Sequence, residues 1–141
     1  MKRFLHEKSL FLAWLIAVIG TLTSLYWSEV LFWPVCHLCW YQRLCMFPLA
    51  IILAPAAYQG YTKIAKYVIA LPILGIFFSA YQYLEQTIPG FMPINTCSTG
   101  PSCAQIHLKL FGFLTLPLIG LLGFLFITLF LLLAIRHGKR R

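Results

Sequence analysis

The chain has 141 residues, of which 61% are hydrophobic and 10% are charged, and its formal net charge is +8. Soluble domains carry about 25% charged residues, so this composition excludes an ordinary soluble domain and predicts one integral membrane domain, residues 1–141. The positive charge does not indicate nucleic acid, because the basic residues lie beside apolar segments and no phosphate-binding loop or zinc-finger spacing accompanies them.

Four apolar segments follow one another along the chain, and we expect them to cross the membrane as helices at 9–28, 39–58, 67–84 and 110–135. The first segment is expected to be a retained helix and not a cleaved signal peptide. Its apolar run is longer than the roughly 7–15 residues of the apolar region in a signal peptide. Short connections between successive helices favour an all-α, four-helix bundle.

The basic residues predict how this bundle is oriented. Nine of the eleven lysines and arginines lie in segments 1–8, 59–66 and 136–141. Because positive charge is retained on the cytoplasmic side, both termini are expected in the cytoplasm, and the connections 29–38 and 85–109 are expected on the outer face. That face then carries four of the five cysteines: Cys36, Cys39, Cys97 and Cys103.

A short stretch at the start of the second apolar segment combines Cys36, Cys39 and Arg43. A helix that begins near Cys39 places Cys39 and Arg43 on one face, one turn apart. A helix N-terminus and a nearby cation both favour the reactive thiolate. Arg43 is open to two interpretations, an interfacial anchor or a hydrogen-bond donor to a lipid-soluble acceptor such as a quinone.

The two outer cysteine pairs suggest a relay, because disulfides form and persist outside the cytoplasm. Cys36 and Cys39 have a common redox spacing, and five turn-prone residues separate Cys97 from Cys103. One dithiol could then reduce the other disulfide. The alternative for the second pair is a structural staple.

Other interpretations of the cysteines also remain open. The four outer cysteines, with His37 and His107, could bind zinc, although the spacer of the second pair is wider than usual for zinc ligands. His37 could instead raise the reactivity of a neighbouring thiolate or form a simple loop hydrogen bond. We expect Cys45 to be a buried, inert thiol.

Residues 36–43 (Cys-His-Leu-Cys-Trp-Tyr-Gln-Arg) resemble the C-x-x-C-x-Y-x-R stretch of the disulfide bond formation protein B (DsbB) family. The four-helix pattern, the inside termini and the second outer cysteine pair agree with this family along nearly the whole chain. The short second pair and residues 111–118 (Phe-Gly-Phe-Leu-Thr-Leu-Pro-Leu) look most like the compact BdbC branch of Gram-positive bacteria.

The resemblance implies a thiol:quinone oxidoreductase of the bacterial cell membrane that needs no metal. Such a protein re-oxidises a secreted or membrane-anchored thioredoxin-fold thiol oxidase (DsbA/BdbD-like) and passes electrons to menaquinone or ubiquinone, which supports disulfide bond formation. Carried over residue by residue, Cys97 forms the mixed disulfide with the partner and Cys103 exchanges with Cys36. Cys39 is then the thiolate that meets the quinone, and Arg43 positions and polarises the quinone.

One departure and two rivals accompany this interpretation. Longer Gram-negative members hold the second cysteine pair much further apart, so a different exchange order stays open here. A vitamin K epoxide reductase-like protein is also a quinone-linked four-helix bundle, but it usually places its C-x-x-C at the last helix. A non-enzymatic membrane scaffold with a cysteine zinc site would instead bind stoichiometric metal and reduce no quinone.

Overall fold

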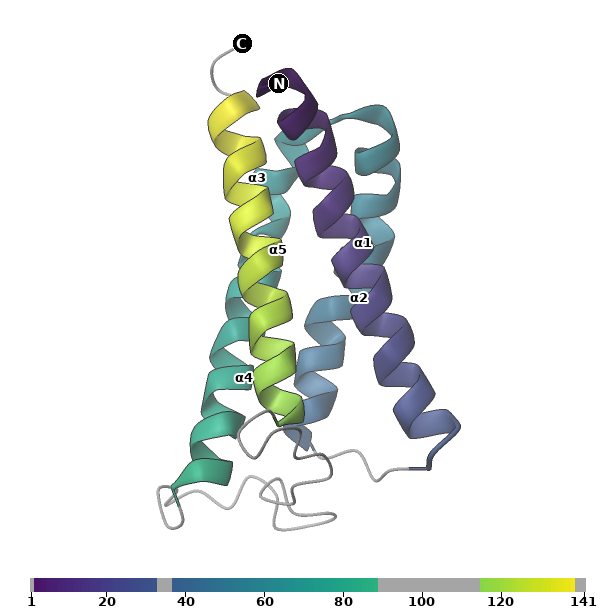
Figure 1. The fold of residues 1–141 in the computed structure, drawn as a ribbon, viewed down its shortest axis with the longest axis vertical. Coiled ribbons are helices and arrows are strands. Elements are labelled where there is room, and N and C mark those ends of the chain that lie inside the picture. The colour runs from purple at the N-terminus through teal and green to yellow at the C-terminus, as the bar shows by residue number, and fades with distance from the viewer. Residues whose placement is uncertain (1, 33–36, 89–114, 139–141) are drawn as a thin grey trace.

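A computed structural model of the chain describes residues 2–32, 37–88 and 115–138 (Figure 1). Within these ranges every regular element is a helix, which confirms the all-α class. The elements are α1 (Lys2–Glu29), α2 (His37–Gln59), a 3-10 turn η1 (Thr62–Ile64), α3 (Ala65–Val68), α4 (Ala70–Thr87) and α5 (Leu116–Gly138). In this part of the chain, α1, α2 and α5 are long and apolar enough to cross a membrane, and η1–α3 with α4 forms a fourth, bent candidate.

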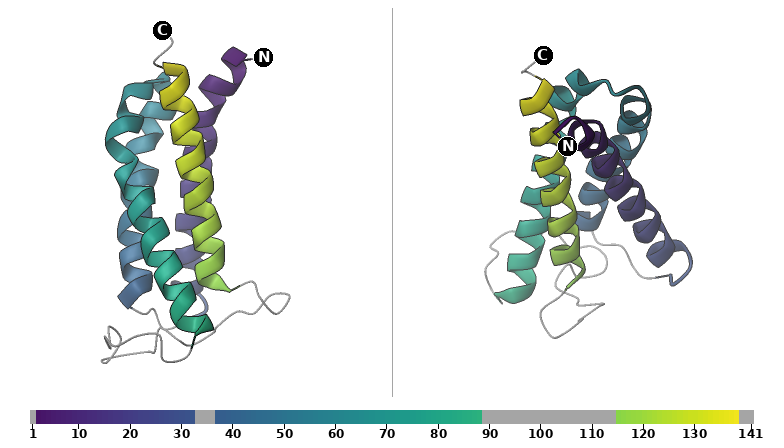
Figure 2. Two further views of the ribbon diagram at one scale, coloured as in Figure 1. Left: turned by 90° about the vertical axis from the view of Figure 1, so that its left-hand side faces the viewer. Right: turned by 45° about the horizontal axis from the view of Figure 1, so that its top comes forward.

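The helices run alternately up and down in a bundle, and α1 begins at the end where α5 finishes (Figures 1 and 2). The opposite end, where α2 and α5 begin, is called the cavity end below. Towards the cavity end, α1 diverges from α5 (Figures 1 and 2). This arrangement agrees with the predicted four-helix bundle.

The third predicted helix is not the uninterrupted element expected over 67–84. α3 ends at Val68, α4 begins at Ala70, and the axes of the two helical parts differ by 41°. Pro72 contributes to this bend, because its nitrogen cannot donate to the Val68 carbonyl and its ring crowds that carbonyl. The backbone N–H of Ile69 still donates to the Ala65 carbonyl at 3.1 Å, so the chain bends without leaving the helical path.

The polar turn expected over 59–66 is shorter than predicted. Gly60 adopts the left-handed conformation with φ of 67°, and the N–H of Tyr61 donates to the Ala56 carbonyl at 3.1 Å. This pattern is a Schellman ending, in which glycine relieves the steric cost of positive φ. Helical structure therefore resumes at Thr62, inside the segment that we expected to be a turn.

The last helix also begins later than predicted. Thr115 is not helical and α5 starts at Leu116, whereas we expected a helix from Leu110; residues 110–114 lie outside the described residues. Pro117 favours this boundary, because a proline in the first turn of a helix sacrifices no hydrogen bond. In contrast, Pro48 and Pro55 lie inside α2, which continues through both.

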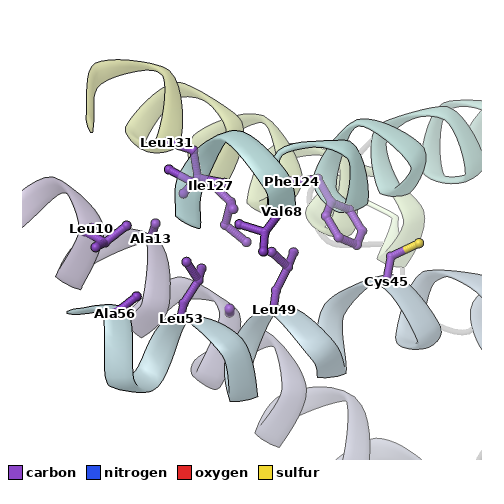
Figure 3. Packing of buried hydrophobic residues seen from close by; sticks show 12 residues of the cluster. Leu10, Ala13, Cys45, Leu49, Leu53, Ala56, Val68, Phe124, Ile127 and Leu131 are labelled. Atoms are coloured by element: carbon purple, nitrogen blue, oxygen red, sulfur yellow. The ribbon is translucent and has the colours of Figure 1, made fainter. Parts of the chain in front are cut away.

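The core lies mainly between α1, α2 and α5, and α3 also contributes to it (Figure 3). Small residues allow close helix approach, which is the main source of packing in membrane bundles. A Cβ atom added to Gly75 of α4 would overlap the Phe124 ring of α5. The cluster includes the buried residues Leu10, Ala13, Ala17, Cys45, Leu49, Leu53, Ala56, Val68, Phe124, Ile127 and Leu131.

Candidate functional site

A cavity of about 340 Å³ lies at the cavity end, bordered by the second half of α1, the first half of α2, the start of α5 and one residue of α4. Most of its wall is apolar. A few polar side chains interrupt that wall: Thr23, Ser24, Ser28, Cys39, Gln42, Arg43 and Gln82. A largely apolar cavity with a small number of polar groups is typical of a small-molecule site.

Cys39 lies in the first turn of α2 and lines this cavity. The first N–H groups of a helix have no partner within it and favour negative charge nearby. The preceding residue, Leu38, is buried against Phe78 and Tyr81, which fixes the start of α2 against α4. Tyr41 stacks on Phe78 with ring centroids 5.2 Å apart, and this contact further fixes the turn that carries the sulfur.

Arg43 lies one turn after Cys39 and lines the same cavity, as their spacing predicts. Its Nε donates to Ser24 Oγ at 2.8 Å, and its Nη2 donates to the Ser24 backbone oxygen at 2.7 Å. Its Cζ also lies 5.7 Å from the centroid of the Trp40 ring. The half-buried guanidinium is therefore held between α1 and an aromatic ring, with a cation–π contact on one side.

Two glutamines beside Cys39 were missed by the sequence reasoning. Gln82 of α4 is 3% exposed, and its Nε2 donates to Cys39 Sγ at 3.3 Å. Gln42 Nε2 donates to Gln82 Oε1 at 2.7 Å. The available signal was a glutamine inside the apolar run 67–84, because a buried amide is costly unless it is hydrogen-bonded.

The structure brings together Cys39 and Arg43, but it does not test the whole predicted relay. Cys36, Cys97 and Cys103 lie outside the described residues, as does His107, so their arrangement remains a prediction. The residues that the structure does describe contain no group of three or more metal-ligating side chains. His37 is exposed at the start of α2.

Cys45 occupies a different environment from Cys39. It is 5% exposed and belongs to the hydrophobic core, which confirms its predicted burial. It is also absent from the cavity wall. Its expected inertness stays a prediction.

A cysteine, an arginine and amides on one apolar cavity form a site suited to an apolar molecule with polar carbonyl groups. The fold and this site define a multi-pass helical membrane protein with a thiol on the wall of a largely apolar cavity. The sequence model of the family described as disulfide bond formation protein DsbB matches residues 6–134. The chain therefore belongs to the DsbB family, whose members are disulfide-forming oxidoreductases.

Curated relatives extend along nearly the whole chain. A probable disulfide formation protein of Coxiella burnetii is 53% identical over 142 residues, covering 100% of this chain and 97% of the relative. Disulfide bond formation protein C of Bacillus subtilis is 44% identical over 124 residues, covering 88% and 90%. A probable disulfide formation protein of Chlamydia caviae is 40% identical over 134 residues, covering 95% and 96%. No solved structure is significantly similar to the chain.

These comparisons confirm the family resemblance carried by residues 36–43, including the likeness to the short branch. They favour a role in disulfide formation over the vitamin K epoxide reductase-like alternative. They name neither a quinone nor a partner for this chain.

Proposed function

We propose that the protein is a thiol:quinone oxidoreductase that re-oxidises a thioredoxin-fold thiol oxidase and delivers the electrons to a membrane quinone. The observation that carries this proposal is the shared cavity of Cys39 and Arg43, which places a thiol and a cation on one largely apolar wall. A thiol oxidase partner is expected because the family forms disulfides in other proteins and needs a dithiol to supply electrons.

The residues of the cavity fit a quinone. Two N–H groups of Arg43 donate hydrogen bonds to Ser24. The guanidinium has further N–H groups that can donate to a ring carbonyl. Apolar side chains such as Ile19, Met46 and Phe47 border the same space and suit a hydrophobic ring and tail. A bound quinone would supply a two-electron acceptor at this wall.

The proposed thiol exchange balances as follows. The partner dithiol reduces the Cys97–Cys103 disulfide and becomes a disulfide itself. The resulting thiols then reduce the Cys36–Cys39 disulfide by exchange through a mixed disulfide. The Cys36–Cys39 dithiol finally loses two electrons and two protons, which convert one quinone to quinol and restore the disulfide. Whenever Cys39 is reduced, Arg43 and the start of α2 favour its thiolate.

We also propose that the cavity end faces the outside of the cell. Lys63, Lys66 and Arg136 lie near the opposite end of the bundle, and the positive-inside rule assigns that end to the cytoplasm. A reporter active only in the cytoplasm should function when fused after Arg141. A reporter active only outside should function when inserted between residues 89 and 96, and the reverse pattern would refute this orientation.

The decisive experiment mixes the purified protein in detergent with a reduced thioredoxin-fold dithiol protein and either a ubiquinone or a menaquinone analogue. We expect loss of the quinone absorbance that depends on all four outer cysteines. The absence of quinone reduction with both analogues and several partners would refute the proposal. Stoichiometric zinc in the same inactive preparation would favour the metal-binding scaffold instead.

A further inference from the structure

Gln82 is a buried amide whose position in α4 brings it against the sulfur of Cys39, 43 residues earlier in the chain. Its Nε2 lies 3.3 Å and its Oε1 3.8 Å from Cys39 Sγ. Both polar ends of the amide are thus within hydrogen-bonding reach of the sulfur, and the N–H contact is the shorter one.

Gln42 fixes the direction of the Gln82 amide. It lies three residues after Cys39 on α2, so both side chains project towards the same side of that helix. The Nε2 of Gln42 donates to Gln82 Oε1 at 2.7 Å. Inverting the Gln82 amide would place two N–H groups against each other, so this bond keeps Nε2 of Gln82 towards the sulfur.

Gly120 of α5 leaves the space that this arrangement needs. A Cβ atom at Gly120 would lie 3.3 Å from Gln42 Oε1 and 3.6 Å from Ser79 Oγ. Three helices therefore meet around the two amides: α2 supplies Gln42, α4 supplies Gln82, and α5 supplies a position without a side chain.

We propose that Gln82 is a positioning residue for the Cys39 thiolate, and that Gln42 determines which end of the Gln82 amide faces the sulfur. This inference rests on the proposed function and adds a residue from another helix to its thiol chemistry. In an apolar cavity a thiolate needs hydrogen-bond donors to compensate for lost hydration, and Gln82 supplies one. When Cys39 is protonated, Oε1 can accept the S–H, so the same amide holds both forms of the sulfur.

The alternative is that the two glutamines only join helices, and this role leads to a different prediction. Hydrogen bonds between glutamines join helices in membranes, so removing either side chain would lower stability in that case. Such a role would leave the reactivity of the Cys39 sulfur unchanged in the folded protein. Measuring thiolate chemistry separately from stability therefore distinguishes the two roles.

The test uses the full-length, reduced protein in detergent, without quinone or partner. Alkylation of Cys39 by iodoacetamide is followed by peptide mass spectrometry, and thiolate absorption is followed in the ultraviolet. Gln82→Met keeps the side-chain length but removes the N–H donor, and we expect it to slow Cys39 alkylation about tenfold. Gln42→Leu leaves the N–H donor of Gln82 in place but no longer fixes its orientation, and we expect it to slow Cys39 alkylation about threefold.

Ser79→Ala is the matched control, because Ser79 is buried one turn earlier on α4 and its Oγ has no hydrogen-bond partner among the described residues. It should alkylate Cys39 at the wild-type rate. Wild-type rates in both folded glutamine variants would overturn the proposal, as would an equal slowing by Ser79→Ala. If Gln82→Met fails to fold, the Gln42→Leu rate alone decides.

This result is separable from the proposed function. Failure of the wild-type protein to reduce quinone would refute the oxidoreductase proposal, whereas the alkylation rates would still report the contact between Gln82 and Cys39. Where quinone reduction does occur, Gln82→Met should lower kcat for the thiol-to-quinone step, whatever its effect on KM for quinone, because Gln82 also lines the cavity. A change confined to KM would contradict a role at the sulfur.

Discussion

Ser24 of α1 accepts two hydrogen bonds from the guanidinium of Arg43, one at its side-chain oxygen at 2.8 Å and one at its backbone oxygen at 2.7 Å. The pair joins two helices at the wall of the cavity. Because both bonds leave from one rigid, planar group, they fix its orientation as well as its position. The positive charge is therefore set in place before any ligand binds.

Replacing Arg43 with alanine should impair the use of quinone more than the use of the protein partner. The lost hydrogen bonds from a charged donor are worth about 1.5–3 kcal/mol, so we expect the apparent KM for quinone to rise at least about tenfold. Steady-state kinetics with each substrate varied in turn measures this difference. Arg136→Ala, at the exposed far end of α5, is the control, and an unchanged KM for quinone in Arg43→Ala would contradict the assignment.

Replacing Ser24 with alanine should have a smaller effect in the same direction. The variant loses the Oγ acceptor but keeps the backbone oxygen, so one of the two bonds to Arg43 survives. A loss of about 0.5–1.5 kcal/mol corresponds to a rise of roughly two- to tenfold in KM for quinone. Thr21→Ala is the control, because it removes a hydroxyl that bonds within α1 to the Ala17 carbonyl, and it should leave KM for quinone unchanged. Equal changes in KM for the Ser24 and Thr21 variants would argue against the contact with Arg43.

Cys39→Ser should abolish quinone reduction, because a serine hydroxyl can neither form the disulfide nor supply the electrons. Quinone absorbance in the presence of reduced partner measures the loss. Cys45→Ala is the natural comparison, since its thiol is buried in the core and does not line the cavity. Turnover in Cys39→Ser would refute the role of this sulfur, and an inactive but folded Cys45→Ala would show that the second thiol takes part.

Gly123→Leu should fill the cavity without disturbing the bundle. Gly123 lines the cavity, and a Cβ atom there would meet no other atom within 4 Å. Leucine is also favoured over glycine inside a helix by nearly 1 kcal/mol. We expect normal thermal stability in detergent with a clear rise in KM for quinone; wild-type quinone kinetics would show that the ligand binds elsewhere.

Gly75→Ala should destabilise the bundle, unlike Gly123→Leu. The added methyl group would overlap the Phe124 ring, which is itself buried in the core. Overpacking of this kind costs about 1–3 kcal/mol, so the melting temperature in detergent should fall. Gly75 does not line the cavity, but the Phe124 ring does, so displacing that ring should also change KM for quinone in the variant that remains folded at low temperature. Wild-type stability would contradict the close contact between α4 and α5.

The sequence was sufficient for features that depend on one helix at a time. The lengths of the apolar runs predict α1, α2 and α5 to within several residues, because a membrane requires a continuous apolar helix. The four-residue spacing of Cys39 and Arg43 places both on one wall, because the helical repeat fixes which residues share a face. The stretch around these two residues also predicts the family, which the family model confirms over residues 6–134.

Proline shows where such reasoning stops. Pro72 accompanies a break between α3 and α4, whereas α2 continues through Pro48 and Pro55. Each proline removes one backbone donor, and nothing in the sequence distinguishes the proline at a bend from the two inside a continuous helix. Whether the helix bends depends on how neighbouring helices support the freed carbonyl and the crowded turn, which is decided by packing.

The contacts around the sulfur were decided only by the tertiary structure. Periodicity gives Cys39 and Arg43 a common face, but it does not say that Ser24 of α1 and Gln82 of α4 lie opposite that face. Those partners are 19 and 43 residues away along the chain. Helical periodicity acts over a few residues, whereas the choice of facing side chain depends on the rotation and packing of separate helices.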